Sequence, residues 1–330
     1  MNLIKQVAVL GAGRMGKAIA IAFAYAGLKV ALIDARPRAE TEFDQYQTQI
    51  QTDLNQELQL LESIQFIHSE QTKIMLHRIE ILSRAVSISA LANCDLVLEG
   101  VPEVRQAKED IFTWLDQYIT PTCIVASTTS TFLVTDIAQM ISHPERVINA
   151  HWLNPAYLIP LVELSRSEQT SDEVVNTLKS FLQAIGKVPV VCNARAGYIV
   201  PRIQALAMNE AARMVEEGVA SVEDIDIAIR TGFGLRFSVL GLLEFIDWGG
   251  GDILYYASQY LHQELGERYR TPKIIAENML LQRNGLREKQ GFYNYQQVDI
   301  AAYKQQVLHT FSDRIAKNQL KPTFNIFNQQ

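Results

Sequence analysis

The segment that most constrains the fold lies within the first 34 residues. Val7 to Leu10 is a short apolar run rich in β-branched residues, and it leads into the turn Gly11-Ala12-Gly13-Arg14-Met15-Gly16. A helix-like stretch follows from Lys17 to Tyr25, and a second buried strand is expected from Lys29 to Ile33, ending at Asp34. A strand, a glycine turn, a helix and a strand in this order are typical of a dinucleotide-binding unit.

Each glycine of the turn has a mechanical role in such a unit. Gly11 permits the tight turn, Gly13 lets the backbone approach a pyrophosphate, and Gly16 lets the helix pack closely on the strand. The N-terminus of the helix offers free N–H groups and a positive dipole end to the phosphates. The turn therefore predicts cofactor contacts, and its candidate residues are Gly11, Gly13, Arg14, Met15 and Gly16.

Asp34 stands at the end of the second predicted strand, 18 residues after Gly16. A carboxylate there can accept hydrogen bonds from the ribose hydroxyls, and it repels a 2′-phosphate, so it favours NAD over NADP. Arg36 and Arg38 follow closely and weaken this preference, because a nearby arginine can hold the 2′-phosphate. We expect NAD as the cofactor and Asp34 as one of its contacts.

Strand and helix patterns alternate from residue 7 to residue 192, which favours a doubly wound sheet covered on both faces. The further strands are expected at Ile79–Leu82, Leu96–Glu99, Ile124–Ala126, Val147–His151, Leu161–Leu164 and Val188–Cys192. Long helical patterns then take over, beginning with Tyr198–Glu217. The predicted fold is an α/β, Rossmann-type NAD-binding domain over residues 1–192, followed by an all-helical substrate and dimerisation domain over residues 193–330.

Composition excludes several other classes of protein. Of the 330 residues, 48% are hydrophobic and 20% are charged, and the formal net charge is −6 at pH 7. Intrinsic disorder needs lower hydrophobicity and higher net charge, and a nucleic-acid binder needs a cationic surface. Three cysteines without metal-ligand spacing predict no metal site. The first residues lack a secretory signal, and no apolar stretch is long enough to span a bilayer, so we expect a cytoplasmic protein.

His151 and Glu163 are the residues whose chemistry suggests catalysis. His151 follows a predicted strand in HWLNP, and Glu163 lies 12 residues further on in LVELS. A histidine at a strand end can act as general base on a substrate hydroxyl, and a carboxylate at its other ring nitrogen would orient it. The alternative is a structural histidine with both nitrogens satisfied inside the fold, and the spacing alone leaves both readings open.

A set of motifs between residues 5 and 295 resembles the 3-hydroxyacyl-CoA dehydrogenase family, in the family's order. These motifs are VAVLGAGRMGKAIA, LVLEGVPEVRQAKEDIF, ASTTSTFLVTDIA, HPERVINAHWLNP, LVELSR, ARAGYIVPRI, NEAARMVEEGVASVEDID and GLREKQGFYNY. The resemblance implies an NAD-dependent enzyme of fatty acid metabolism that oxidises the 3-hydroxyl of a 3-hydroxyacyl-CoA, such as 3-hydroxybutyryl-CoA. It also implies a homodimer.

The resemblance also implies roles for individual residues. His151 would be the base and Glu163 its orienting carboxylate, while Ser130 would contact the substrate oxygen and the nicotinamide region. Asn154 would position the nicotinamide or the reacting carbonyl. Two further residues match family positions that contact the cofactor, namely Glu103 and Lys108.

Three departures from the family pattern put the acyl-CoA substrate in question. Pro201 replaces the asparagine of the family motif G-F-x-x-N-R. The stretch from Gln49 to Leu61 lacks the lysines that would bind the phosphates of CoA, and it carries Asp53 and Glu57 instead. Arg236, in GFGLRF, resembles the branch that acts on free hydroxy acids, such as gulonate and carnitine dehydrogenases, and could bind a substrate carboxylate.

Two alternatives therefore stand beside the acyl-CoA reading. One is a dehydrogenase of a free 3-hydroxy carboxylic acid, with Arg236 as its carboxylate contact; the other interpretation of Arg236 is a surface or interdomain salt bridge. The other is a non-enzymatic, NAD-binding structural protein, as crystallin relatives of the family show is possible. The intact set of Ser130, His151, Asn154 and Glu163 argues against the second alternative.

Overall fold

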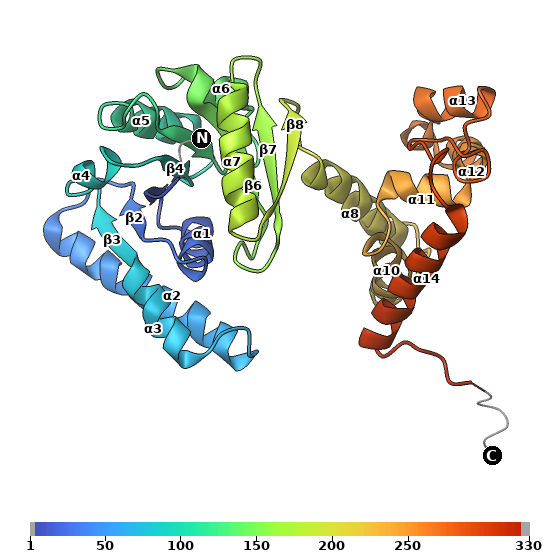
Figure 1. Ribbon diagram of the computed structural model, residues 1–330, viewed down its shortest axis with the longest axis horizontal. Coiled ribbons are helices and arrows are strands. Elements are labelled where there is room, and N and C mark those ends of the chain that lie inside the picture. The colour runs from blue at the N-terminus through green and yellow to red at the C-terminus, as the bar shows by residue number, and fades with distance from the viewer. Residues whose placement is uncertain (1–3, 325–330) are drawn as a thin grey trace. The chain divides into compact units, whose positions relative to one another are not determined.

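The computed structural model describes residues 4–324 (Figure 1) and divides the chain into two compact units, Met1–Met208 and Asn209–Gln330. The first unit is built on a sheet with helices on both faces, and the second is made of helices. The division falls within helix α8 (Val200–Glu216), which begins near the end of the first unit. The predicted boundary after Cys192 remains a prediction.

One sheet of eight strands forms the frame of the N-terminal unit, with the order β3-β2-β1-β4-β5-β6-β7-β8 over the described residues. The strands are β1 (Val7–Leu10), β2 (Val30–Asp34), β3 (Ile79–Ser83), β4 (Leu96–Glu99), β5 (Ile124–Ser127), β6 (Val147–Trp152), β7 (Leu161–Arg166) and β8 (Val188–Asn193). All neighbouring strands are parallel except β6 and β7, which pair antiparallel. The predicted doubly wound, Rossmann-type sheet is confirmed.

Two hydrophobic cores, one on each face of the sheet, hold the N-terminal unit together. Along β1, Val7 and Val9 face one core while Ala8 and Leu10 face the other, as the period of two of a strand requires. Helices α1 (Arg14–Tyr25), α2 (Glu40–Ser63), α3 (Ser69–Arg78) and α7 (Asp172–Ala184) cover the first face. Helices α4 (Ile88–Leu91), α5 (Arg105–Leu115) and α6 (Val134–Ala138) cover the second.

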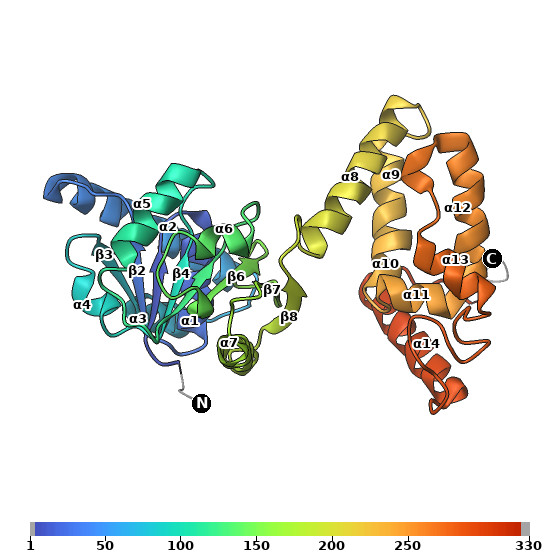
Figure 2. The same ribbon diagram turned by 90° about the horizontal axis from the view of Figure 1, so that it is seen from above.

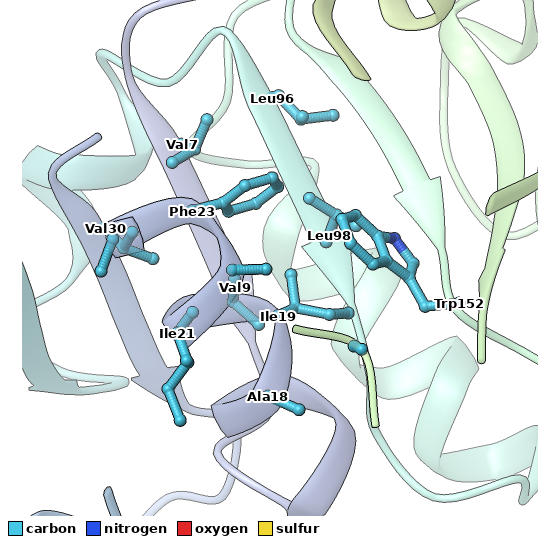
Figure 3. Close-up of a cluster of buried hydrophobic side chains, with 14 of the residues drawn as sticks. Val7, Val9, Ala18, Ile19, Ile21, Phe23, Val30, Leu96, Leu98 and Trp152 are labelled. Carbon is cyan, nitrogen blue, oxygen red and sulfur yellow. The ribbon is translucent and has the colours of Figure 1, made fainter. Parts of the chain in front are cut away.

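The first core closes around Phe23 of α1 and Trp152 of β6 (Figure 3). Their rings meet edge to face with centroids 5.8 Å apart, a favoured arrangement of aromatic pairs. Trp152 is fully buried, and it therefore anchors the end of β6 in this core. Because side chains alternate along a strand, the preceding residue, His151, points to the opposite face of the sheet.

The C-terminal unit contains the rest of α8 and the helices α9 (Val222–Ala228), α10 (Gly234–Phe237), α11 (Leu242–Gly249), α12 (Gly251–Leu265), α13 (Lys273–Leu280) and α14 (Ile300–Lys317) (Figure 2). The predicted helical character of this part is confirmed. The described chain also contains three short helical turns, at Ile229–Phe233 and Glu267–Tyr269 in the C-terminal unit and at Pro144–Arg146 in the N-terminal unit. No helix within residues 4–324 is both long and apolar enough to cross a membrane.

The late motif GLREKQGFYNY folds around the buried carboxylate of Asp247. Asp247 accepts hydrogen bonds from the N–H groups of Phe292 and Tyr293 at 2.9 and 2.8 Å. A Cβ atom at Gly291 would lie 2.0 Å from one of its oxygens, so only glycine fits there. This motif is therefore explained by the packing of the C-terminal unit.

Candidate active site

Most of the sequence-predicted site residues of the N-terminal unit gather at the carboxyl ends of the parallel strands. β1 ends at the glycine turn, β5 ends just before Ser130, and β6 ends with His151 and Trp152. Ligands of open α/β sheets bind at this edge. Glu163 reaches it from β7, because β7 runs antiparallel to β6 and places Glu163 directly opposite His151 in the register.

His151 links Ser130 and Glu163 in one hydrogen-bonded chain. The Nδ1 atom of His151 lies 2.9 Å from Oε2 of Glu163, and the Nε2 atom lies 3.1 Å from Oγ of Ser130. Glu163 is fully buried and His151 is 5% exposed, whereas Ser130 is exposed at the edge. The carboxylate thus orients the imidazole from the inside of the fold, and the serine lies where a substrate can reach it.

The second carboxylate oxygen of Glu163 is held by the backbone at the start of α8. It accepts hydrogen bonds from the N–H groups of Ile199 and Val200 at 2.9 and 2.8 Å. Burial raises the pKa of Glu163, but the hydrogen bonds from His151, Val200 and Ile199 outweigh it and leave the pKa below its usual value. An ionised carboxylate only accepts, so Nδ1 of His151 carries the proton and Nε2 is left free to accept one.

Glu103 holds the loop that carries Ser130. Its carboxylate accepts hydrogen bonds from the hydroxyl of Thr129 at 2.7 Å, from the N–H of Ser130 at 2.9 Å and from the hydroxyl of Thr131 at 2.9 Å. Burial raises the pKa of Glu103, but these hydrogen bonds, together with the charge of Lys108, lower it to below its usual value. The charged Glu103 therefore fixes the loop, and its predicted contact with the cofactor remains a prediction.

Lys108 lies in a buried ion pair beneath the same edge of the sheet. Its ammonium is 2.9 and 3.1 Å from the two carboxylate oxygens of Glu99, which also accepts a hydrogen bond of 2.5 Å from Ser127. Lys108 and Glu99 are both fully buried. The structure thus places Lys108 in a network that joins α5 to the ends of β4 and β5, and its contact with the cofactor also remains a prediction.

The glycine turn has the shape that a dinucleotide needs. A Cβ atom at Gly16 would lie 1.9 Å from the carbonyl oxygen of Gly11, so α1 packs against the turn too closely for any side chain. No atom lies within 4 Å of a Cβ at Gly13, and no side chain caps the N-terminus of α1. The N–H groups of this first turn are therefore open to an anion, which fits the pyrophosphate of a dinucleotide.

Asp34 lies at the end of β2, buried and already paired. Its carboxylate accepts hydrogen bonds from the N–H of Arg36 at 3.2 Å and from Nε of Arg38 at 2.5 Å. The guanidinium of Arg38 also lies over the ring of Tyr46, 4.2 Å from the centroid. Arg38 thus neutralises Asp34 in this structure, and a 2′-phosphate would have to compete with that carboxylate for it.

Asn154 and the acidic face of α2 border one cavity of about 410 Å³. Asn154 makes no side-chain hydrogen bond to another described residue, and Arg14 of the glycine turn lines the cavity from α1. Asp53 forms an ion pair with Lys17, and Glu57 accepts a hydrogen bond of 2.5 Å from Tyr157. Asp53 also accepts a hydrogen bond of 2.7 Å from Gln49. The stretch of α2 at this cavity therefore presents two carboxylates, beside the basic side chains of Arg14 and Lys17.

The remaining predicted residues occupy separate surroundings. Met15 packs against the first core beside the glycine turn. Arg236 lies on α10 of the C-terminal unit, exposed, with its guanidinium 5.6 Å from the ring centroid of Phe245 and in no ion pair with another described residue. Pro201 is the second residue of α8, where a proline is tolerated. Within residues 4–324, no group of three or more His, Cys, Asp or Glu side chains could hold a metal ion.

Sequence reasoning missed Tyr198, which touches three parts of the site. Its ring stacks on His151, and its hydroxyl contacts Thr129 and Asn149. Tyr198 lies in the motif ARAGYIVPRI, but nothing in that pattern indicates its positive φ or its contact with His151. The two backbone N–H groups that hold Glu163 come from the same segment.

Comparisons with known proteins agree with this geometry. The model of the "3-hydroxyacyl-CoA dehydrogenase, NAD binding domain" matches residues 6–195, and that of the "3-hydroxyacyl-CoA dehydrogenase, C-terminal domain" matches residues 197–295. A 3-hydroxybutyryl-CoA dehydrogenase of Bradyrhizobium diazoefficiens is 34% identical over 294 residues, which cover 89% of this chain and 96% of that protein.

Two further relatives show the range of the family. The 5-formyl-3-hydroxy-2-methylpyridine 4-carboxylate 5-dehydrogenase of Mesorhizobium japonicum is 29% identical over 311 residues, covering 89% of this chain and 91% of that protein. The crystal structure of a 3-hydroxyacyl-CoA dehydrogenase from Archaeoglobus fulgidus superposes with a TM-score of 0.75 at 29% identity, covering 96% of this chain and 99% of that one. All three are named as dehydrogenases, which argues against a non-enzymatic structural protein. The chain belongs to the 3-hydroxyacyl-CoA dehydrogenase family and is an NAD-dependent oxidoreductase.

Proposed function

We propose that the enzyme oxidises the 3-hydroxyl of a 3-hydroxyacyl-CoA, such as 3-hydroxybutyryl-CoA, to the 3-keto compound in fatty acid metabolism. The observation that carries this proposal is the hydrogen-bonded chain from Ser130 through His151 to Glu163 at the carboxyl edge of the sheet. Relatives that are named 3-hydroxybutyryl-CoA dehydrogenase support the thioester as the substrate.

His151 is the general base of the proposed reaction. Its Nε2 atom takes the proton from the substrate hydroxyl, and the C–H bond at the same carbon gives its hydride to the nicotinamide, which is the chemistry that bound NAD supplies. Glu163 stabilises the imidazolium that forms, because its carboxylate stays charged beside Nδ1. A buried and hydrogen-bonded carboxylate does this without reorganisation during the reaction.

Ser130 and Asn154 position the reacting groups. The hydroxyl of Ser130 lies 3.1 Å from the base, so it can direct the substrate oxygen toward Nε2. Asn154 follows β6, and its amide makes no hydrogen bond to another side chain or backbone group in the described part of the chain, so it can orient the carbonyl or the nicotinamide. We propose both as contacts of the reacting centre.

The cofactor contacts follow from the open first turn of α1. Gly11, Gly13 and Gly16 shape the turn, while Arg14 and Met15 supply N–H groups at its start. Asp34 would accept hydrogen bonds from the ribose hydroxyls at the end of β2. The proposed set also includes the two residues beneath the Ser130 loop, Glu103 and Lys108.

A second candidate substrate is a free hydroxy carboxylic acid. The exposed Arg236 guanidinium forms no ion pair with another described residue, which supports a role in binding a substrate carboxylate. Asp53 and Glu57 offset the positive charges of Arg14 and Lys17 at the cavity beside Asn154, so this cavity offers no net positive charge to the phosphates of a nucleotide. The Mesorhizobium japonicum relative is named for a carboxylate substrate, which favours the same alternative.

Initial rates of NADH formation separate the two substrates. We expect kcat/KM for 3-hydroxybutyryl-CoA to exceed that for free 3-hydroxybutyrate by at least about 100-fold, because a site that contacts the polar groups of a substrate rejects an analogue without them. The reverse preference, together with a raised KM in Arg236→Gln, would establish the free acid. Arg230→Gln is the matched control, since Arg230 is also exposed in this unit but pairs with Asp226. If neither compound leads to NADH formation, both candidate functions are contradicted.

We also propose the domain arrangement and assembly that accompany this function. Residues 1–192 would form the NAD-binding domain, and residues 193–330 the substrate and dimerisation domain. One face of α12 exposes Ile253, Tyr256 and Tyr260, each about 60% accessible, which supports a homodimer that buries this face. A cytoplasmic location completes the proposal.

A further inference from the structure

Tyr198 occupies a backbone conformation that few side chains adopt. Gly197 and Tyr198 connect β8 to α8 with φ angles of +82° and +45°. A positive φ is unfavourable for an aromatic residue, so the surrounding contacts must hold Tyr198 in place. Those contacts are with His151 itself and with two residues close to the site, Thr129 and Asn149.

The ring of Tyr198 lies flat against the imidazole of His151. The two centroids are 4.8 Å apart, and the planes are inclined by 15°. This stacking covers one face of the imidazole and opposes its rotation toward that side. The ring therefore fixes the direction in which Nε2 points.

The hydroxyl of Tyr198 ties the Ser130 loop to strand β6. It donates a hydrogen bond of 2.7 Å to the carbonyl of Thr129 and accepts one of 3.0 Å from Nδ2 of Asn149. Burial raises the pKa of Tyr198 well above its usual value, so the hydroxyl keeps its proton. Thr129 precedes Ser130, and Asn149 lies two residues before His151 on the same face of β6. The hydroxyl of Tyr198 therefore joins the loop that carries Ser130 to strand β6.

The backbone that follows completes this arrangement. The N–H groups of Ile199 and Val200 bind the carboxylate of Glu163. The segment Gly197–Val200 thus contacts the base, its carboxylate and the serine loop within four residues.

We propose that Tyr198 is a positioning residue that sets the distance between Ser130 and His151 through its hydroxyl and the plane of His151 through its ring. This inference rests on the proposed role of His151 as base. Phenylalanine at this position would keep the stacking and lose the link to Thr129, so the hydroxyl can be tested alone.

Two measurements on Tyr198→Phe test the inference. Amide hydrogen exchange of the peptide spanning residues 128–133 is expected to become at least about fivefold faster, because the loop loses one of its anchors. The kcat value is expected to fall about tenfold with little change in KM, since a small displacement of reacting groups is costly. In the Ser130→Ala background the same substitution is expected to leave kcat nearly unchanged, because the hydroxyl acts through Ser130.

Tyr303→Phe is the matched control, since the hydroxyl of Tyr303 bonds to Glu244 at 2.6 Å within the C-terminal unit. Unchanged exchange in residues 128–133, or an equal loss of kcat with and without Ser130, would overturn the inference. If the wild-type enzyme oxidises no 3-hydroxy substrate, the proposed function fails, and the hydrogen-exchange result still decides whether Tyr198 anchors the loop.

Discussion

His151 and His143 both lie beside a glutamate, but their surroundings give the two pairs different roles. The imidazole of His143 is 3.1 Å from Glu145, and both side chains are about half exposed. Water screens such a pair, so it contributes little to stability. The pair of His151 and Glu163 is almost completely buried, and the charge on Glu163 therefore acts directly on the imidazole.

The glycines of the turn also differ in what confines them. Gly16→Ala is expected to lower the free energy of unfolding by about 1–3 kcal/mol, because its methyl group would overlap the carbonyl of Gly11. Gly13→Ala is expected to change that free energy by less than about 0.5 kcal/mol, since φ is −73° and the space is open. Its methyl group would instead stand where a pyrophosphate approaches, so NADH should bind at least about tenfold more weakly.

Urea unfolding and a fluorescence titration with NADH measure these two effects separately. Each variant serves as the control for the other, because both add one methyl group to the same turn. Equal losses of stability in the two variants would contradict the packing described for Gly16. Unchanged NADH binding in Gly13→Ala would remove the turn from the cofactor site.

At the scale of elements, the strands were predictable but their directions were not. Every predicted strand is confirmed to within two residues, because buried runs of Val, Ile and Leu are a local signal. The antiparallel pairing of β6 and β7 depends on how residues 153–160 turn, and it is this pairing that sets Glu163 opposite His151. The spacing of 12 residues was therefore compatible with contact but could not establish it.

The site itself was predictable only where a side chain carries recognisable chemistry. Ser130, His151 and Glu163 could be named from their residue types and the family resemblance. The backbone N–H groups of Ile199 and Val200 leave no trace in a sequence, since every residue except proline has one. Tyr198 was missed for a related reason: its role depends on a positive φ that periodicity does not encode.

The exposed face of α12 predicts the assembly of the enzyme. Light scattering at micromolar concentration is expected to give the mass of a dimer, and Tyr256→Lys with Tyr260→Lys is expected to give a monomer, because two charges would be buried at the interface. Leu60→Lys is the control, since Leu60 is similarly exposed but lies on α2 of the N-terminal unit. A wild-type monomer, or a dimer that survives both lysines, contradicts the proposal for α12.

For the whole molecule, the features that fit the cofactor and the chemistry are distinct from the features that bear on the substrate. The glycine turn, the sheet order and the Ser130–His151–Glu163 chain fit NAD-dependent oxidation of a hydroxyl. The carboxylates on α2 and Arg236, which forms no ion pair within residues 4–324, bear on which molecule carries that hydroxyl. The net charge of −6 is thus less informative than the placement of the acidic residues.

The most direct test of the central claim is the turnover of His151→Ala, measured beside its affinity for NADH. We expect kcat to fall about 10³-fold, as for the loss of a general base, while NADH binds as tightly as to the wild type. His143→Ala removes an imidazole from the exposed pair with Glu145 and should leave turnover unchanged. Turnover of His151→Ala equal to that of the wild type would contradict the account.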